Sequence, residues 1–228
     1  MNKKSKKGIC VFCGNMRELT KDHIPPKTIF PKPRPNNLIT VPSCYECNDS
    51  AKKDDEYFGV MMAMQDTNGR HSSSSKLLPK IFDGLRHEKA KGFKQKVFQN
   101  FRVQNVVTES GIFLGEHPIF EEEAAPIVRV IERTCKGLFY FEKNKHYPSD
   151  YSIKVCFGNS LTDGGIKAQN ILVKSAQAAF TAIPKEIGNG EFKYWLRFTY
   201  DDENAFVAIF EVFKSHYFLC YSIPKDRL

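Results

Sequence analysis

Two pairs of closely spaced cysteines place the strongest constraint on how this chain can fold. The first pair is Cys10-Val-Phe-Cys13 and the second is Cys44-Tyr-Glu-Cys47, about thirty residues further along. Each pair can form a tight turn that directs two thiolates to one point, and two such turns supply the four ligands of a tetrahedral structural zinc ion. Disulfides are the alternative, but nothing else in the chain is typical of a secreted protein. We therefore predict a closed zinc site formed by Cys10, Cys13, Cys44 and Cys47.

The composition is typical of a soluble globular protein. Of 228 residues, 41% are hydrophobic and 26% are charged. The remaining cysteines, Cys135, Cys156 and Cys220, lie in apolar segments, and their odd number favours reduced, buried thiols. No apolar run approaches the roughly 18–20 residues needed to span a bilayer, and no apolar signal core follows the basic start of the chain. We expect a cytoplasmic protein without a membrane partner.

The segment between the cysteine pairs carries a family pattern. It contains Asp22-His23-Ile24-Pro25-Pro26, then Asn36-Asn37-Leu38-Ile39-Thr40-Val41, and Asn48 directly follows Cys47. In this order and at these intervals, the residues resemble the HNH endonucleases, in the subgroup whose ββα-metal core is held by a four-cysteine zinc site. The resemblance covers residues from about 8 to 60 and implies a zinc-stabilised, treble-clef-like ββα-metal module.

The resemblance also implies a role for each residue of the pattern. His23 is expected to act as the general base that takes a proton from water, because a neutral imidazole near pH 7 suits that task. Asp22 and Asn48 are expected to hold a catalytic Mg²⁺ or Mn²⁺ through oxygen atoms, and the metal would assist the departing 3′ oxygen. Asn37 is expected to orient His23 or to brace its loop.

Positive charge is concentrated in the same half of the chain. Residues 1–100 hold 19 Lys and Arg against 10 Asp and Glu, whereas residues 101–228 hold 15 against 16. Clustered positive charge beside this motif predicts a nucleic-acid partner, DNA with RNA not excluded. The candidates for phosphate contacts are Lys21, Lys27, Lys52 and Lys53. The alternative is a set of exposed lysines that only aids solubility.

Hydrophobic periodicity predicts the order of the elements. We expect a basic disordered tail over 1–7, the nuclease module over 8–66 and an α+β domain of unknown role over 67–228. Helices are predicted from within Cys44–Asn48 to about Gln65, around Leu77–Leu85, and from Ala124 to a stop at Gly137. Strands are predicted over Val97–Val107, Ile112–Leu114 and Ile153–Phe157, and a C-terminal antiparallel meander over Phe192–Tyr200, Ala205–Phe213 and Tyr217–Ile223. The predicted fold class is therefore α+β.

Three functions remain open on these observations. The first is a metal-dependent endonuclease that hydrolyses phosphodiester bonds. The second is a zinc-stabilised nucleic-acid-binding module without catalysis, and the third is an interaction protein whose C-terminal domain binds a protein partner or a second copy. Asp22, His23 and Asn48 favour the first, because binding alone needs no base beside two oxygen ligands.

Overall fold

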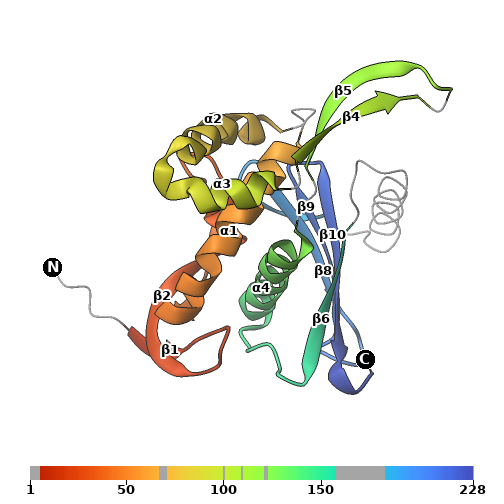
Figure 1. Cartoon of the computed structure of the whole chain (residues 1–228). Coiled ribbons are helices and arrows are strands. Elements are labelled where there is room, and N and C mark those ends of the chain that lie inside the picture. Colours follow the sequence, from red (N-terminus) through yellow and green to blue (C-terminus); the bar gives the residue numbers. More distant parts are fainter. Residues whose placement is uncertain are drawn as a thin grey trace.

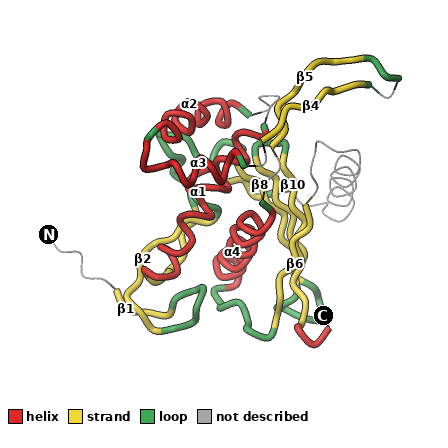
Figure 2. The backbone as a smooth tube through the Cα atoms, in the orientation of Figure 1, coloured by secondary structure: helices red, strands yellow, loops and turns green. Residues whose placement is uncertain are grey.

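The computed structural model of the chain describes residues 6–66, 71–99, 101–108, 110–120, 123–157 and 183–227. These residues form a mixed α+β structure, as the sequence predicts. A small antiparallel sheet lies on one side, helices α1 (Tyr45–Gln65) and α4 (Ala124–Lys143) lie in the middle, and a larger antiparallel sheet lies on the other side (Figures 1 and 2). None of the described helices is both long and apolar enough to cross a bilayer.

The small sheet carries the first cysteine pair. Its strands are β1 (Lys6–Ile9), β2 (Met16–Ile24) and β3 (Ile39–Cys44), in the order β1-β2-β3, and the 3₁₀ turn η1 (Lys27–Ile29) lies in the loop after β2. The turn between β1 and β2 closes through a 2.9 Å hydrogen bond from the Gly14 N–H to the Cys10 carbonyl. Gly14 has a φ of 72°, a conformation that glycine adopts without steric cost. The chain thus passes from a cysteine turn through a strand, a loop and a second strand to the second cysteine pair.

Helix α1 begins where β3 ends and differs between its two halves. Cys44 is its N-cap, and the Cys44 Sγ accepts a 3.4 Å hydrogen bond from the Cys47 N–H. In the first half only Ala51 is buried, whereas Tyr57–Met64 form a continuous buried run. The predicted end near Gln65 is confirmed. The helix therefore connects the cysteine turns to the apolar core.

The prediction that the helix beginning at Ala124 stops at Gly137 is wrong. Helix α4 continues to Lys143 and ends at Asn144, whose backbone is left-handed and whose N–H donates to the Tyr140 carbonyl. Gly137 instead lies where α4 meets β2, since a Cβ at this position would lie 2.5 Å from Cγ1 of Ile24. Close packing, rather than a helix end, explains the glycine.

The larger sheet has the strand order β6-β10-β9-β8-β7, with antiparallel neighbours throughout. Its strands are β6 (Tyr151–Phe157), β7 (Lys185–Ile187), β8 (Phe192–Phe198), β9 (Phe206–Val212) and β10 (His216–Pro224). The predicted meander is confirmed as β8, β9 and β10, and the predicted strand over Ile153–Phe157 as part of β6. The sequence missed β7, because three residues are too few to show a period. The sheet face toward α1 and α4 is aromatic, with buried Phe192, Phe206, Phe210 and Phe218.

The segment between α1 and α4 holds α2 (Ser72–Arg86), the 3₁₀ turn η2 (Glu88–Ala90), α3 (Lys91–Phe98), β4 (Phe101–Val107) and β5 (Phe113–Phe120). The predicted strand over Val97–Val107 is wrong at its start, because Val97 is a buried residue of α3 and packing outweighs its β-branched preference. The predicted second helix is confirmed as α2. Its cap is His71 rather than a serine, since the His71 Nδ1 accepts a 3.2 Å hydrogen bond from the Ser73 N–H.

One continuous cluster of buried apolar side chains joins both sheets and the helices between them. It includes Val41 from β3, Met61 from α1, Leu138 from α4 and Phe210 from β9. The predicted domain boundary after residue 66 stays a prediction, and the shared core couples the segments on its two sides.

A buried polar network also ties the helices to the larger sheet. The Asp66 carboxylate accepts hydrogen bonds from Ser74 Oγ at 2.5 Å and from Ser215 Oγ at 3.1 Å. The Glu191 carboxylate accepts one from Ser73 Oγ at 2.7 Å. Because Asp66, Ser74 and Glu191 are buried, these bonds satisfy carboxylates that would otherwise be costly to remove from water. The serine run after His71 therefore has a structural role.

Candidate metal centre and catalytic site

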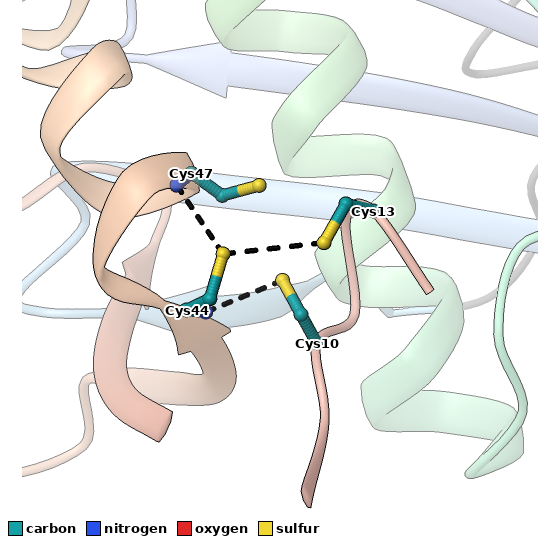
Figure 3. Close-up of side chains that lie close together, drawn as sticks. All are labelled: Cys10, Cys13, Cys44 and Cys47. Atoms are coloured by element: carbon teal, nitrogen blue, oxygen red, sulfur yellow. Dashed lines mark hydrogen bonds between the residues drawn. The ribbon is translucent and has the colours of Figure 1, made fainter. Parts of the chain in front are cut away.

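The predicted cysteine ligands converge on one point (Figure 3). Cys10 and Cys13 lie in the turn after β1, Cys44 ends β3, and Cys47 lies in the first turn of α1. Their four Sγ atoms lie within 4.8 Å of one another, and those of Cys13 and Cys44 are 3.9 Å apart. Sulfur atoms at zinc-bonding distance in a tetrahedron lie about 3.8 Å apart. The cluster can therefore hold a metal such as zinc, with four protein ligands and no position left for substrate.

Backbone hydrogen bonds favour the thiolate form of one of the four ligands, Cys10, whereas the pKa values of the Cys44 and Cys47 thiols are raised, that of Cys47 chiefly by burial. Burial raises the pKa of the Cys10 thiol, but backbone hydrogen bonds from Cys44, Cys13 and Phe12 outweigh it and lower that pKa to about 6. The bond from the Cys44 N–H to the Cys10 Sγ is 3.3 Å long. Because a metal binds the thiolate form, these donors favour the species that a metal requires.

Asp22 lies on β2 and faces inward, with only 6% of its surface exposed. Its Oδ1 accepts a 2.9 Å hydrogen bond from the His23 N–H. Its Oδ2 accepts two N–H groups of Arg133, one from Nε at 3.1 Å and one from Nη2. A carboxylate oxygen has two lone pairs, so the two Arg133 N–H groups use both lone pairs of Oδ2, and the His23 N–H uses one of the two on Oδ1.

Arg133 comes from α4, far from the cysteine pairs in sequence. Its guanidinium lies 3.6 Å from the ring centroid of Phe12, which stands between Cys10 and Cys13. Only 16% of the Arg133 side chain and 8% of the Asp22 side chain are exposed. The stacked guanidinium thus links the first cysteine turn, β2 and α4 at one point, in a desolvated setting where cation–π contacts and ion pairs are strong.

Asp55 is a third ionisable group near this pair. Burial, followed by the negative charge of Asp22, raises the pKa of the Asp55 carboxyl to about 7, although Arg133 lowers it. Asp55 and Arg133 both line a cavity of about 290 Å³ between α1 and α4, together with Asp54 and Arg129. The Asp54 and Arg129 side chains form a more exposed ion pair, with 2.6 Å between Nε and Oδ2.

His23 follows Asp22 on β2 and therefore faces the opposite side of the strand. It is partly exposed to solvent. Burial, and then the positive charges of Lys27 and Arg34, lower the pKa of its imidazole, against a raising effect of Asp22. The ring is therefore neutral at pH 7, the form that can accept a proton.

Asn48 lies in the first turn of α1, beside the strand that carries Asp22. Its Nδ2 donates to Thr20 Oγ1 at 3.0 Å and to the Lys21 carbonyl at 3.3 Å. Since the amide nitrogen is used by β2, Oδ1 is the end that can serve as a ligand. Asp22 Oδ1 and Asn48 Oδ1 are hard oxygen donors and suit Mg²⁺ or Mn²⁺. Asp22 Oδ2 does not fit that role while Arg133 is bound to it.

The Asn37 side chain is directed at the larger sheet. Its Nδ2 donates to the Glu186 carbonyl at 3.3 Å, and its Oδ1 accepts from the Gly188 N–H at 2.9 Å. The two ends of the amide thus bind β7 and the turn that follows it. These contacts brace the loop between β2 and β3, one of the two expected roles, and they are not directed at His23.

The predicted phosphate-binding lysines are exposed residues around the site. Lys21 and Lys27 are exposed on and after β2, and Lys53 is exposed on α1. Lys52 forms a 2.5 Å ion pair with Asp49. Their charge is thus accessible to a polyanion.

Comparisons with protein-family models, with curated proteins and with solved structures found no match for this chain. The sequence interpretation missed Arg133, Phe12 and Asp55 as parts of the site. Asp22 and Arg133 are separated by 111 positions, and no local pattern indicates such a pair. The available signal was a charged residue on the otherwise apolar face of α4, between Val130 and Gly137.

Proposed function

We propose that this chain is a metal-dependent endonuclease of the HNH type, which hydrolyses phosphodiester bonds of DNA. One observation carries the proposal. Asn48 is hydrogen-bonded to Thr20 and Lys21, the two residues that precede Asp22-His23, at a helix start fixed by the four-cysteine cluster. In this proposal the cysteine turns, the β2–β3 hairpin and the start of α1 are a treble-clef-like ββα-metal module whose cysteines bind zinc.

His23 is the base in the proposed reaction. Its neutral imidazole takes a proton from the attacking water. Because its pKa is lowered, the imidazole stays neutral at pH values at which an ordinary histidine is already protonated. Asp22 and Asn48 would hold Mg²⁺ or Mn²⁺, which supplies charge neutralisation at the phosphate and the leaving oxygen. Lys21, Lys27, Lys52 and Lys53 attract the phosphate backbone, consistent with the positive charge of residues 1–100.

Plasmid cleavage tests the proposal, with Mg²⁺, Mn²⁺ or a chelator, for wild type, His23→Ala and the control His87→Ala. His87 is an exposed histidine outside the module. We expect His23→Ala to lose about 10²–10⁴-fold in cleavage rate, with zinc content and DNA affinity retained, and His87→Ala to cut like wild type. The acidic limb of the rate profile should have its midpoint below about 6.5. Undiminished cleavage by His23→Ala, or in the chelator, contradicts the proposal.

The Arg133 contact favours a second candidate, a zinc-stabilised module that binds nucleic acid without cutting it. Here Arg133 is the permanent cation on Asp22, and no divalent metal is needed. The same plasmid assay separates the candidates. Salt-sensitive DNA binding by a zinc-loaded wild type that leaves the plasmid intact with every metal supports the second candidate.

A further inference from the structure

The ribbon formed by β4 and β5 is an isolated two-stranded sheet that projects away from the rest of the molecule (Figure 1). Among the described residues, its strands pair only with each other. Two-stranded ribbons are marginally stable in water unless a further surface covers them. The side chains of this ribbon should therefore show what kind of surface covers it.

Its two faces differ in chemistry. Phe101, Val103 and Val107 alternate along β4 on one face, and Phe113 is the cross-strand partner of Val107. Arg102, Gln104 and Val106 are on the opposite face. The exposed fractions are 43% for Phe101, 56% for Val103, 55% for Val107 and 59% for Phe113. Ile112 and Leu114 lie beside the register shift at the tip of the ribbon and are 63% and 57% exposed. Exposed apolar residues gathered in this way mark an interaction surface.

The charge of the ribbon argues against a nucleic-acid partner. Residues 101–120 contain one arginine and two glutamates, whereas residues 1–100 carry an excess of nine positive charges. A surface that binds phosphates needs cations to neutralise them. A surface that packs on its own copy needs little net charge, because like charges would meet across the twofold axis.

We propose that two copies of the chain form a dimer by packing these apolar ribbon faces against each other. The four exposed apolar side chains on this face and the two at the tip of the ribbon together offer about 600 Å² per copy, so two copies bury about 1,200 Å², the lower end of the range for specific interfaces. Asn105 and Glu116 are cross-strand partners on the same face. A twofold arrangement can place the amide of one copy against the carboxylate of the other, which avoids an unpaired charge. The dimer is independent of the nuclease proposal.

Sedimentation equilibrium tests the dimer with two variants that add the same charge at adjacent positions. Val103→Glu places a carboxylate on the apolar face, and Gln104→Glu places it on the opposite face. We expect wild type and Gln104→Glu to dimerise with a Kd on the order of micromolar. Val103→Glu should dimerise at least about 30-fold more weakly, since it leaves an unpaired charge in the interface.

Zinc content and far-ultraviolet circular dichroism report whether each variant is folded, and Phe113→Glu provides an independent second disruption. A wild type that stays monomeric at about 100 times the expected Kd overturns the proposal. The proposal is also overturned if Val103→Glu and Phe113→Glu both fold and dimerise like wild type, because the interface is then elsewhere. A loss of DNA affinity in Val103→Glu, with no change in self-association, assigns the face to nucleic acid instead.

Discussion

Strand β2 buries two of its nine residues, whereas β9, on the other side of the molecule, buries five of seven. Strand β2 is mostly exposed up to Lys21, and we expect its order to depend on the four cysteines that converge beside it. The larger sheet has an aromatic face that packs on α1 and α4, and none of the four clustered cysteines lies in its strands. Apolar burial therefore stabilises the larger sheet, and metal ligation is expected to stabilise the small sheet, although both sheets share one core.

Removing the metal should produce the largest difference in stability between the two sheets. Binding of zinc to structural sites is worth about 10–16 kcal/mol in zinc-finger peptides, and this energy is also folding energy. We expect Cys44→Ser to lose zinc and to lose hydrogen-exchange protection in β1, β2 and the start of α1, with β8–β10 still protected. The control Cys156→Ser changes a thiol outside the cluster, which is exposed rather than buried as the sequence predicted, and it should change neither property. Equal loss of protection in both sheets would show that the difference is not real.

A cavity in the larger sheet should have the opposite effect. Phe210 is fully buried, and Phe210→Ala should lower the free energy of unfolding by about 3–5 kcal/mol. Denaturant unfolding measures this change, and elemental analysis should still find one zinc per chain. Val207→Ala, at an exposed position of the same strand, is the control and should cost less than about 1 kcal/mol. A Phe210→Ala protein that loses zinc before it unfolds would contradict the comparison.

The ion pair between Arg133 and Asp22 joins α4 to the small sheet. Its removal should lower the stability of the protein strongly. Arg133→Met leaves a buried carboxylate without its partner and should destabilise the protein by roughly 3 kcal/mol. Arg129→Met breaks a more exposed pair with Asp54 and should cost about 0–1 kcal/mol. Asp22→Asn should recover part of the loss when combined with Arg133→Met, as a double-mutant cycle measures. Equal costs for the two arginines would exclude a special role for Arg133.

Asp55 gives the smallest expected effect, and the effect depends on pH. Its folded-state pKa of about 7 lies above the ordinary value of 3.8. The folded state therefore binds a proton that the unfolded state releases between these values, so stability is full below about pH 4 and falls as the pH rises to about 7. Screening limits the change to roughly 1–2 kcal/mol for this partly exposed group. Unfolding titrations at several pH values should show this slope in wild type, and Asp55→Asn should remove it.

The sequence predicted those parts of the molecule that local patterns encode. The spacing of the cysteines predicted their convergence, and three strand-like runs separated by short polar segments predicted the meander, because both are properties of neighbouring residues. The contact of Arg133 with Asp22 has no such pattern, since it depends on how α4 packs against β2. Gly137 has two physical explanations, a helix end or a close approach, and the sequence alone favoured the wrong one. Val97 was assigned to a strand by its propensity, and tertiary packing placed it in a helix.

The bare backbone at Gly137 has a consequence for how the site can vary. It lies one helical turn after Arg133, and its missing side chain lets α4 rest against Ile24, two residues after Asp22. A methyl group at this position would push α4 and β2 apart. That displacement would also move the Arg133 guanidinium away from the Asp22 carboxylate. The spacing of two charged groups is thus set by a residue that has no functional group at all. A search for changes that tune this protein should include position 137 as well as the polar residues around it.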